Sequence, residues 1–307
     1  MQTKNQVRVI IPATTANCGP GFDTLGIACS LYNEIELELT DSRNLTDIKV
    51  LGEGSGNLPV NSRNLVLRSV RAVLDKAEFG ETGVRLILRN NIPLSRGLGS
   101  SSAAIVGGLV AANAIIGNPF NKDILLDMAT RLEGHPDNVA PALHGGFTIS
   151  VQQEQRVTCL RLPLPSELRL VVCIPDFGLS TRKAREAIPG SVTHKDAVYN
   201  VGRTALLVGA IASGRLEYLS DALVDKLHQP YRAALIPGML DVFEAGREAG
   251  ALGVVMSGAG PSLMAYVVEN EETVGEAMVK AFAKHKISSR YLSLEVDYNG
   301  ARITDPA

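Results

Sequence analysis

The pattern of apolar and polar residues predicts short strands and longer helices in mixed order. Alternation of apolar and polar positions predicts half-buried strands over 33–40 and 84–88, and apolar runs predict others over 7–11, 146–151, 168–174, 253–256, 263–268 and 291–296. Helical spacing predicts helices over 65–79, 121–133, 197–212, 216–227, 239–249 and 271–286. Residues 103–116 are apolar all round, which is typical of a helix buried in a core.

The order of these elements predicts an α+β fold in two domains. With 307 residues the chain is long enough for two ordinary domains. A polar segment at 152–156 provides a boundary and divides the chain into residues 1–155 and 156–307. In the second part, the order helix, strand, glycine turn, strand, helix, strand predicts an open α+β sandwich. Residues 12–23 are too rich in Gly and Pro for regular structure, and we expect a loop there.

Composition and charge indicate a cytosolic protein with a small partner molecule. Hydrophobic residues make up 45% and charged residues 20% of the chain, and a net charge of -2 supplies no field that attracts nucleic acid or an anionic membrane. Residues 1–5 are polar, and no apolar run reaches the roughly 18 residues of a membrane span. The four cysteines show no Cys-x-x-Cys pairing, which fits a reducing compartment. A homodimer is left open.

A segment dense in glycine and serine joins the strand at 84–88 to the buried helix. Gly97 and Gly99 let a ligand approach the main chain, and the serines place free N–H groups and hydroxyls at the helix start. There the helix dipole supplies roughly +0.5 of a charge, so an anion is favoured. The segment predicts a phosphate cradle made of Pro93, Leu94, Ser95, Arg96, Gly97, Leu98, Gly99, Ser100, Ser101, Ser102 and Ala103.

Two other phosphate motifs are excluded by the residues themselves. The chain contains no Gly-Lys pair and therefore no P-loop lysine. Ser102 stands where the dinucleotide fingerprint requires Gly or Ala. The simpler alternative is a glycine turn capped by serine before a core helix, and a shorter run would favour it. Twelve residues of this density, from Pro93 to Ala104, favour the cradle.

The run from Pro93 to Ala103 resembles the central ATP-binding motif of the GHMP kinases, the superfamily of galactokinase, homoserine kinase, mevalonate kinase and phosphomevalonate kinase. The resemblance implies that this loop wraps the triphosphate of ATP and that Ser101 helps to hold Mg²⁺. It also implies an N-terminal domain like domain 2 of ribosomal protein S5 and a ferredoxin-like C-terminal α/β sandwich. Gly258–Ser262 resembles the third motif, and Gly258 and Gly260 are implied to contact phosphate through their backbone. Ala259 stands where many members carry Ser or Thr.

Two asparagines and an aspartate are implied to contact the ligands. Pro12–Asp23 resembles the N-terminal segment of the homoserine kinases, which places Asn17 and Asp23 in an amino-acid pocket. In the superfamily an asparagine before the helix that follows lies near the adenine, which points to Asn64. Capping of that helix explains an asparagine there equally well.

The segment Glu133–Pro141 crowds an acid, an imidazole, a second acid and an amide beyond a predicted helix end. It offers Mg²⁺ a hard oxygen ligand. In the homoserine kinases the related stretch implies Glu133 on the metal, with His135, Asp137 and Asn138 facing the acceptor; Glu133, Asp137 and Asn138 are the implied catalytic residues. A hydrogen-bonded structural histidine is the alternative for His135, and equally for His144.

An amino-acid acceptor carries a carboxylate and an ammonium. Arginine binds a carboxylate through two hydrogen bonds, and Arg185 and Arg232 align with the two arginines that hold this group in the homoserine kinases. Thr181 belongs to the same basic cluster as Arg185 and is assigned to the substrate as well. Asp137 is expected to hold the ammonium, although in the mevalonate branch the related aspartate is viewed as a general base. The alternative for each arginine is an exposed charge.

The resemblance spans residues 7–296 and implies an ATP- and Mg²⁺-dependent kinase that makes O-phospho-L-homoserine on the route to threonine. Phosphoryl transfer suits these residue types, because its loose transition state is stabilised mainly by alignment and positive charge. The alternatives are an isoprenoid kinase of the mevalonate type and a catalytically inactive GHMP sensor. Intact Glu133 and Asp137 and the three glycine loops favour an active enzyme.

Overall fold

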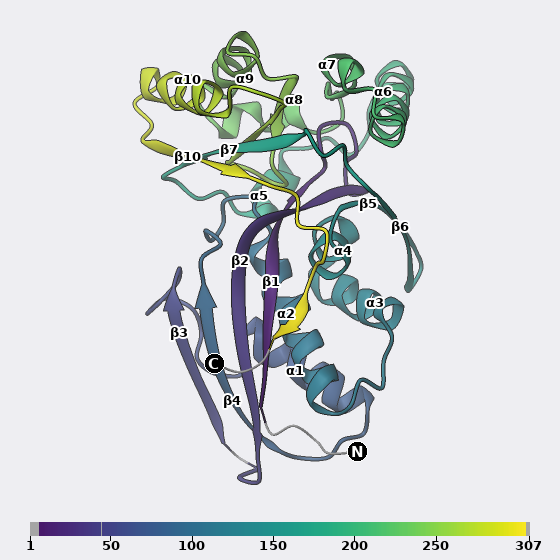
Figure 1. Cartoon of the computed structure of the whole chain (residues 1–307), viewed down its shortest axis with the longest axis vertical. Helices are drawn as coiled ribbons and strands as arrows, with labels where there is room; N and C mark the ends of the chain where they lie inside the picture. Colours follow the sequence, from purple (N-terminus) through teal and green to yellow (C-terminus); the bar gives the residue numbers. More distant parts are fainter. Residues whose placement is uncertain (1–5, 44, 305–307) are drawn as a thin grey trace.

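The computed structural model describes residues 6–43 and 45–304 as two sheets with surrounding helices (Figure 1). Up to the predicted boundary the elements are β1 (Gln6–Ala16), β2 (Leu25–Thr40), β3 (Thr46–Gly52), α1 (Leu65–Lys76), β4 (Gly83–Asn90), α2 (Ser100–Ile115), α3 (Lys122–Glu133), α4 (Pro136–His144) and β5 (Phe147–Gln153). Beyond it lie β6 (Arg156–Leu162), β7 (Arg169–Pro175), α5 (Thr181–Glu186), α6 (His194–Ser213), η1 (Leu216–Tyr218), α7 (Leu219–Ala222), α8 (Gln229–Arg232), η2 (Ala233–Leu235), α9 (Met239–Glu248), β8 (Gly253–Met256), β9 (Leu263–Val267), α10 (Glu271–Lys284), β10 (Ser289–Leu294) and β11 (Arg302–Thr304).

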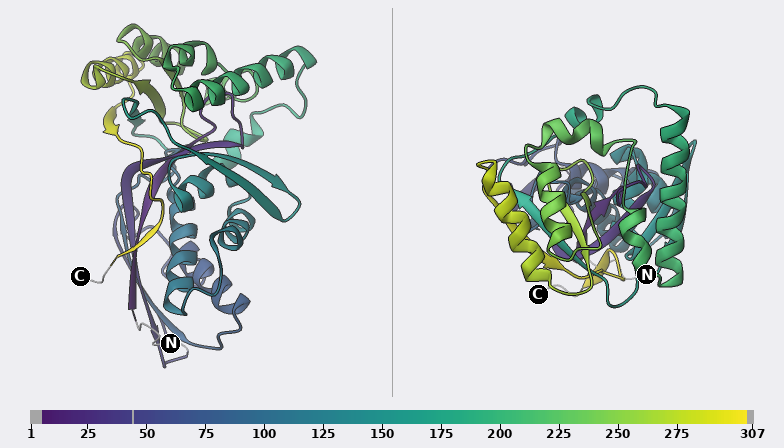
Figure 2. Two further views of the ribbon diagram at one scale, coloured as in Figure 1. Left: turned by 45° about the vertical axis from the view of Figure 1, so that its right-hand side comes forward. Right: turned by 90° about the horizontal axis from the view of Figure 1, so that it is seen from above.

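The first sheet has the order β11-β1-β2-β4-β3, and the hairpin β5–β6 pairs with the start of β2. All neighbouring strands are antiparallel except β3 and β4, which run parallel. Val7, Val9 and Ile11 of β1 are buried while the residues between them are half-exposed, as the two-residue period of a strand requires. Helices α1 to α4 cover one face of this sheet (Figure 2).

The second sheet has the order β10-β7-β9-β8, with all strands antiparallel. Its connections follow a βαββαβ order, in which α9 and α10 are the two helices. Both faces are buried: Leu170, Val172 and Ile174 of β7 join the main core, whereas Val171 and Cys173 pack with α9 and α10 in a second core. This arrangement confirms the ferredoxin-like sandwich that the resemblance implied.

Several local predictions were wrong. Residues 12–16 continue β1 instead of starting a loop, because a bulge between Pro12 and Ala13 lets the strand accommodate the proline. The helix predicted over 216–227 is broken: η1 and α7 end at Ala222, and Asp225 accepts the backbone N–H groups of the three residues 227–229. The polar strands β3 and β6 and the short β11 were not predicted.

The expected boundary between residues 155 and 156 falls in the turn of the β5–β6 hairpin. Both hairpin strands and β11, which pairs with β1, belong to the first sheet. Division of the chain at this point therefore stays a prediction. Among the described helices, none has the length and apolar run that crossing a membrane demands.

Candidate active site

The predicted phosphate cradle connects β4 to α2 and leaves the first turn of that helix open. The helix begins at Ser100, earlier than the apolar pattern indicated, so all three serines lie in its first turn. Gly97 and Gly99 have φ angles of 73° and 70°. A Cβ atom on Gly97 would lie 2.1 Å from the carbonyl oxygen of Ser257, and one on Gly99 would lie 1.9 Å from Thr14 Oγ1. Only glycine fits at either position. Because Gly99 is the N-cap and has no side chain, the first N–H groups of α2 stay available to an anion.

Three segments far apart in the sequence are tied together around this loop. Ser257 Oγ donates to the carbonyl of Gly97 at 2.6 Å, and the Thr14 N–H donates to the carbonyl of Leu98 at 3.1 Å. Asn17 Nδ2 donates to the carbonyl of Gly258 at 2.7 Å. Together they enclose a cavity of about 240 Å³, lined by Asn17, Asp23, Pro93, Ser95, Arg96, Gly97, Leu98, Gly99, Ser100, Ser101, Glu133, His135, Asp137, Asn138, Leu179, Ser180, Thr181, Arg185, Arg232, Gly258, Ala259 and Gly260.

Beside this cavity lies a second one, of about 390 Å³. The two share Ser95, Ser100 and Ser101, and the second has many apolar neighbours, among them Leu58, Leu65, Leu88 and Leu94. Asn64 also lines it, but its Oδ1 accepts the N–H groups of the first turn of α1 and its Nδ2 donates to the carbonyl of Pro59. The side chain therefore caps α1, and its assignment to the adenine stays a prediction.

Not every cradle residue faces a cavity. Ser102 and Ala103 are fully buried and line neither of the two. Arg96 donates to the carbonyls of Leu94, Pro175 and Asp176, so its guanidinium fastens the loop to the end of β7. Ser102 and Ala103 therefore support the loop from the protein interior, whereas Arg96 lines the first cavity and also fastens the loop.

Glu133 is the last residue of α3, which Asn121 caps at its start. Its Oε2 accepts a hydrogen bond from Ser101 Oγ and its Oε1 one from Ser102 Oγ, each at 2.8 Å. The carboxylate is thereby fixed beside the N-terminus of α2. Within residues 6–43 and 45–304, no group of three or more His, Cys, Asp or Glu side chains has a geometry for holding a metal. A hard cation here would need further oxygen ligands from a bound molecule.

A second helix follows α3 directly, because α4 begins at Pro136 and places Asp137 and Asn138 in its first turn. His135 Nδ1 lies 2.5 Å from Asp137 Oδ1, and Asn138 Nδ2 donates to the same oxygen at 3.3 Å. Burial lowers the pKa of His135, but the hydrogen bond and charge of Asp137, together with the charge of Glu133, outweigh burial and leave that pKa raised. His135 lines the cavity and holds the Asp137 carboxylate, so it combines a cavity position with a structural contact.

The two candidate arginines differ in their partners. Arg185 on α5 binds both carboxylate oxygens of Asp23, at 2.7 and 2.9 Å, and this bond is the main reason for its raised pKa. Arg232 on α8 is 2% exposed, so the exposed-charge alternative is wrong for it. It donates from Nε to the carbonyl of Ala184 at 2.9 Å, and no carboxylate among the described residues lies within ion-pair distance. Burial first, then the charge of Arg185, lowers its pKa to about 10.

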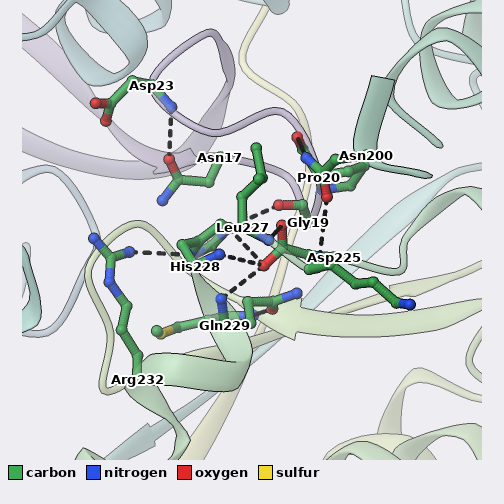
Figure 3. A network of polar contacts seen from close by, with 12 residues as sticks. Asn17, Gly19, Pro20, Asp23, Asn200, Asp225, Leu227, His228, Gln229 and Arg232 are labelled. Atoms are coloured by element: carbon green, nitrogen blue, oxygen red, sulfur yellow. Dashed lines mark hydrogen bonds and ion pairs between the residues drawn. The ribbon is translucent and has the colours of Figure 1, made fainter. Parts of the chain in front are cut away.

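Sequence reasoning missed His228, which lies beside Arg232 (Figure 3). Its Nδ1 is 3.2 Å from an amino nitrogen of Arg232, and its Nε2 is 2.8 Å from the carbonyl oxygen of Gly19. Its ring stacks on Phe22 with centroids 5.0 Å apart. A signal was present, since His228 precedes Arg232 by four residues, about one helical turn.

Comparison with known proteins gives consistent results for both halves of the chain. Residues 64–146 match the GHMP kinases N terminal domain, and residues 207–285 match the GHMP kinases C terminal domain. The chain is 47% identical to a homoserine kinase of Moorella thermoacetica, over 95% of this chain and 98% of the relative. It is 44% identical to a homoserine kinase of Desulfitobacterium hafniense, over 97% and 99%. The crystal structure of a homoserine kinase from Cytophaga hutchinsonii superposes with a TM-score of 0.91 at 32% identity, covering 99% of each chain.

Proposed function

Because the chain belongs to the homoserine kinase family of the GHMP kinases, we propose that it transfers the γ-phosphoryl group of ATP to the hydroxyl of L-homoserine. The protein is an ATP-dependent small-molecule kinase, and O-phospho-L-homoserine, on the route to threonine, is its product. The observation that carries the choice of a carboxylate-bearing acceptor is the buried guanidinium of Arg232, which lines the same cavity as the phosphate cradle and pairs with no described carboxylate.

We assign ATP to the two adjoining cavities. The phosphates lie against the open first turn of α2 and the backbone of Gly97, Gly99, Gly258 and Gly260. The adenine occupies the more apolar second cavity, next to the residues that Asn64 organises at the start of α1. Shared serines at 95, 100 and 101 connect the two parts of the nucleotide.

Glu133 and Ser101 would hold Mg²⁺. One carboxylate and one hydroxyl fit this cation, which usually takes one or two carboxylates together with substrate phosphates and water. The serine bonds to Glu133 keep the carboxylate pointing at the cradle. When bound, Mg²⁺ neutralises charge on the phosphate oxygens as the phosphoryl group leaves.

The amino-acid end of homoserine is held at the other side of the first cavity. Arg232 binds the carboxylate, and Arg185 adds a second guanidinium once Asp23 shares it with the substrate. Asp137, with Asp23 nearby in the same lining, receives the ammonium. Asn17 orders this side, because its Oδ1 accepts the N–H of Asp23 at 3.0 Å. Thr181, at the start of α5, also lines the cavity and remains assigned to the substrate.

These residues accelerate transfer by alignment. Asn138, whose Oδ1 accepts a hydrogen bond from Thr14 at 2.8 Å, lies between the cradle and Asp137 and orients the acceptor hydroxyl. Asp137 acts as the ammonium anchor and not as a base, since a loose transition state keeps the hydroxyl proton until late and the γ-phosphate can accept it. The His135 contact holds Asp137 for that task.

The alternative acceptor class fits less well. Mevalonate has a carboxylate but no ammonium, and the side of the cavity assigned to the amino acid offers two carboxylates, Asp23 and Asp137, alongside two guanidinium groups, Arg185 and Arg232. This balance suits a zwitterion. An inactive sensor would not need Glu133 fixed at the cradle by two serines. The homodimer and the cytosolic location stay predictions.

Direct detection of the product tests the proposal. The protein is incubated with ATP, Mg²⁺ and L-homoserine, and phosphorus NMR follows the phosphate monoester that forms. A homoserine-dependent monoester signal supports the proposal, and its absence while ATP binds normally contradicts it.

A further inference from the structure

The guanidinium of Arg232 is held by neutral acceptors. Its Nε donates to the carbonyl of Ala184 at 2.9 Å, and one amino nitrogen lies 3.4 Å from the carbonyl of Gly258. The same amino nitrogen lies 3.2 Å from His228 Nδ1 (Figure 3). The face of Phe22 lies 5.3 Å from the guanidinium carbon. None of these groups carries a negative charge, so the positive charge of Arg232 stays uncompensated by its own supports.

An acidic residue close by is kept away from Arg232 by its own bonds. Asp225 accepts three backbone N–H groups, those of Leu227, His228 and Gln229, at 2.6 to 2.9 Å. A carboxylate with three such bonds is well satisfied where it is. Arg185 differs in this respect, because both carboxylate oxygens of Asp23 accept hydrogen bonds from its guanidinium. A carboxylate support for Arg232 would compete with the substrate carboxylate for the same donors.

The partners of His228 fix its protonation and tautomer. The carbonyl of Gly19 only accepts, so Nε2 carries the hydrogen; the guanidinium only donates, so Nδ1 offers its lone pair. The ring is fully buried, and the charged groups that face it are Asp225, with Oδ2 at 3.6 Å from Nε2, Arg232 and Asp23. His228 is therefore a neutral imidazole with one donor and one acceptor, both in use.

We propose that His228 is a positioning residue for substrate recognition: its Nδ1 orients the guanidinium of Arg232 toward the substrate carboxylate without neutralising it. This inference rests on the proposed function, since it assigns the support of the same carboxylate site. His228 does not line the cavity and acts only through Arg232.

Two substitutions distinguish the hydrogen-bond acceptor role of Nδ1 from the donor role of Nε2. His228→Asn places an amide oxygen near the position of Nδ1 and loses the bond to Gly19, whereas His228→Gln places an amide N–H near Nε2 and loses the acceptor for Arg232. The loss of one charge-assisted hydrogen bond predicts a homoserine KM about 10 to 100 times higher for His228→Gln, with kcat changed by less than about twofold. For His228→Asn, which keeps the acceptor, KM stays within about threefold of wild type.

Thermal unfolding of both variants provides the structural control. If KM rises in both variants in proportion to the loss of Tm, His228 is only a packing residue and the proposal is overturned. If His228→Asn is the more destabilised variant yet keeps the lower KM, the acceptor role is supported. Titration calorimetry of L-homoserine, with ADP and Mg²⁺ present, reports the same difference without turnover.

A double-mutant cycle with Arg232→Ala shows through which residue His228 acts. If it acts through Arg232, His228→Gln adds nothing further in that background, whereas additive losses contradict the proposal. Wild-type turnover of homoserine in the same assay tests the proposed function separately. Failure of the wild type rejects the substrate, and an active wild type with an unaffected His228→Gln variant rejects only the role of His228.

Discussion

Asp23 and Arg185 form an ion pair with two hydrogen bonds. The two amino nitrogens of the guanidinium donate to Oδ2 and Oδ1 of the carboxylate, at 2.9 and 2.7 Å. Both residues line the first cavity, and both side chains are about one third exposed, at 36% and 38%. The two arginines that look equivalent in the sequence thus differ: Arg185 already has a carboxylate, and Arg232 has none among the described residues. We expect Arg232 to provide the main attraction for the substrate carboxylate.

Arg232→Ala should weaken homoserine binding strongly and leave nucleotide binding nearly unchanged. Removing one partner of a desolvated charge pair costs about 2–5 kcal/mol. Calorimetric titration with homoserine and with ADP measures both affinities. Arg182→Ala is the matched control, because Arg182 lies on α5 with an 82% exposed side chain and does not line the cavity. Loss of ADP binding with homoserine binding retained would place Arg232 in the phosphate site instead.

Glu133→Gln should raise the Mg²⁺ concentration needed for half-maximal activity. The amide keeps the shape and can still bond the two serines, but it removes the charge that a divalent cation needs. We expect an increase of about tenfold or more in that concentration, since Glu133 is the charged ligand of the proposed Mg²⁺ site. Glu276→Gln, on the surface of α10 and paired with Lys280, is the control. If Glu133→Gln and wild type need the same Mg²⁺ concentration for half-maximal activity, Glu133 does not hold the metal. The two proteins should in that case also bind ATP with equal affinity when a chelator removes Mg²⁺.

Asp137→Asn distinguishes an anchor from a base. Loss of an ammonium anchor mostly raises the KM for homoserine, because that contact exists in the ground state and the transition state alike. Loss of a base, which contributes typically 10²–10⁴-fold, falls on kcat. We expect the KM effect, measured by steady-state kinetics. A kcat decrease beyond about a hundredfold at unchanged KM would identify Asp137 as the base.

Protonation of His144 should lower the free energy of unfolding in mild acid. Burial first, then the charge of Lys122, lowers its pKa from 6.5 to about 4. Below about pH 6.5 this histidine therefore binds a proton in the unfolded chain but not in the folded chain. The free energy of unfolding that is present above pH 6.5 falls by up to about 3 kcal/mol as the pH decreases toward 4.

Urea unfolding of wild type and His144→Gln between these pH values checks the prediction. The variant should lose less stability than wild type on acidification. Because His135 and His228 also titrate, the difference between the two proteins is the quantity to compare. If the free energy of unfolding changes with pH in the same way for both proteins, His144 is not the cause of the acid destabilisation.

The sequence was sufficient where a local rule decides the structure. Asn121 has the side chain of a helix cap and does cap α3. The glycine turn at Gly258–Ser262 was predicted between two strands, and it joins β8 to β9. The broken helix at 216–227 depends instead on Asp225, whose side chain replaces helical acceptors with its own oxygens. Helical spacing of apolar residues cannot report such a bond.

The cavity itself could be predicted only through the resemblance. Asn17, Glu133 and Arg232 come from distant segments, and only the folded chain brings them into one lining. The support role of Arg96 depends on carbonyl partners 79 and 80 residues away, and that of His228 on the carbonyl of Gly19, which is 209 residues away. No local pattern encodes these contacts, and for the same reason the sequence treated both arginines alike.

The rate of ADP release in the presence of different acceptors tests the central claim most directly. The protein is assayed with ATP and Mg²⁺ and with L-homoserine, mevalonate, galactose or no acceptor. A zwitterion pocket with a free Arg232 predicts rapid ADP release with homoserine and only the acceptor-free background with the other two. Equal turnover of homoserine and mevalonate, or turnover of mevalonate alone, would contradict the assignment.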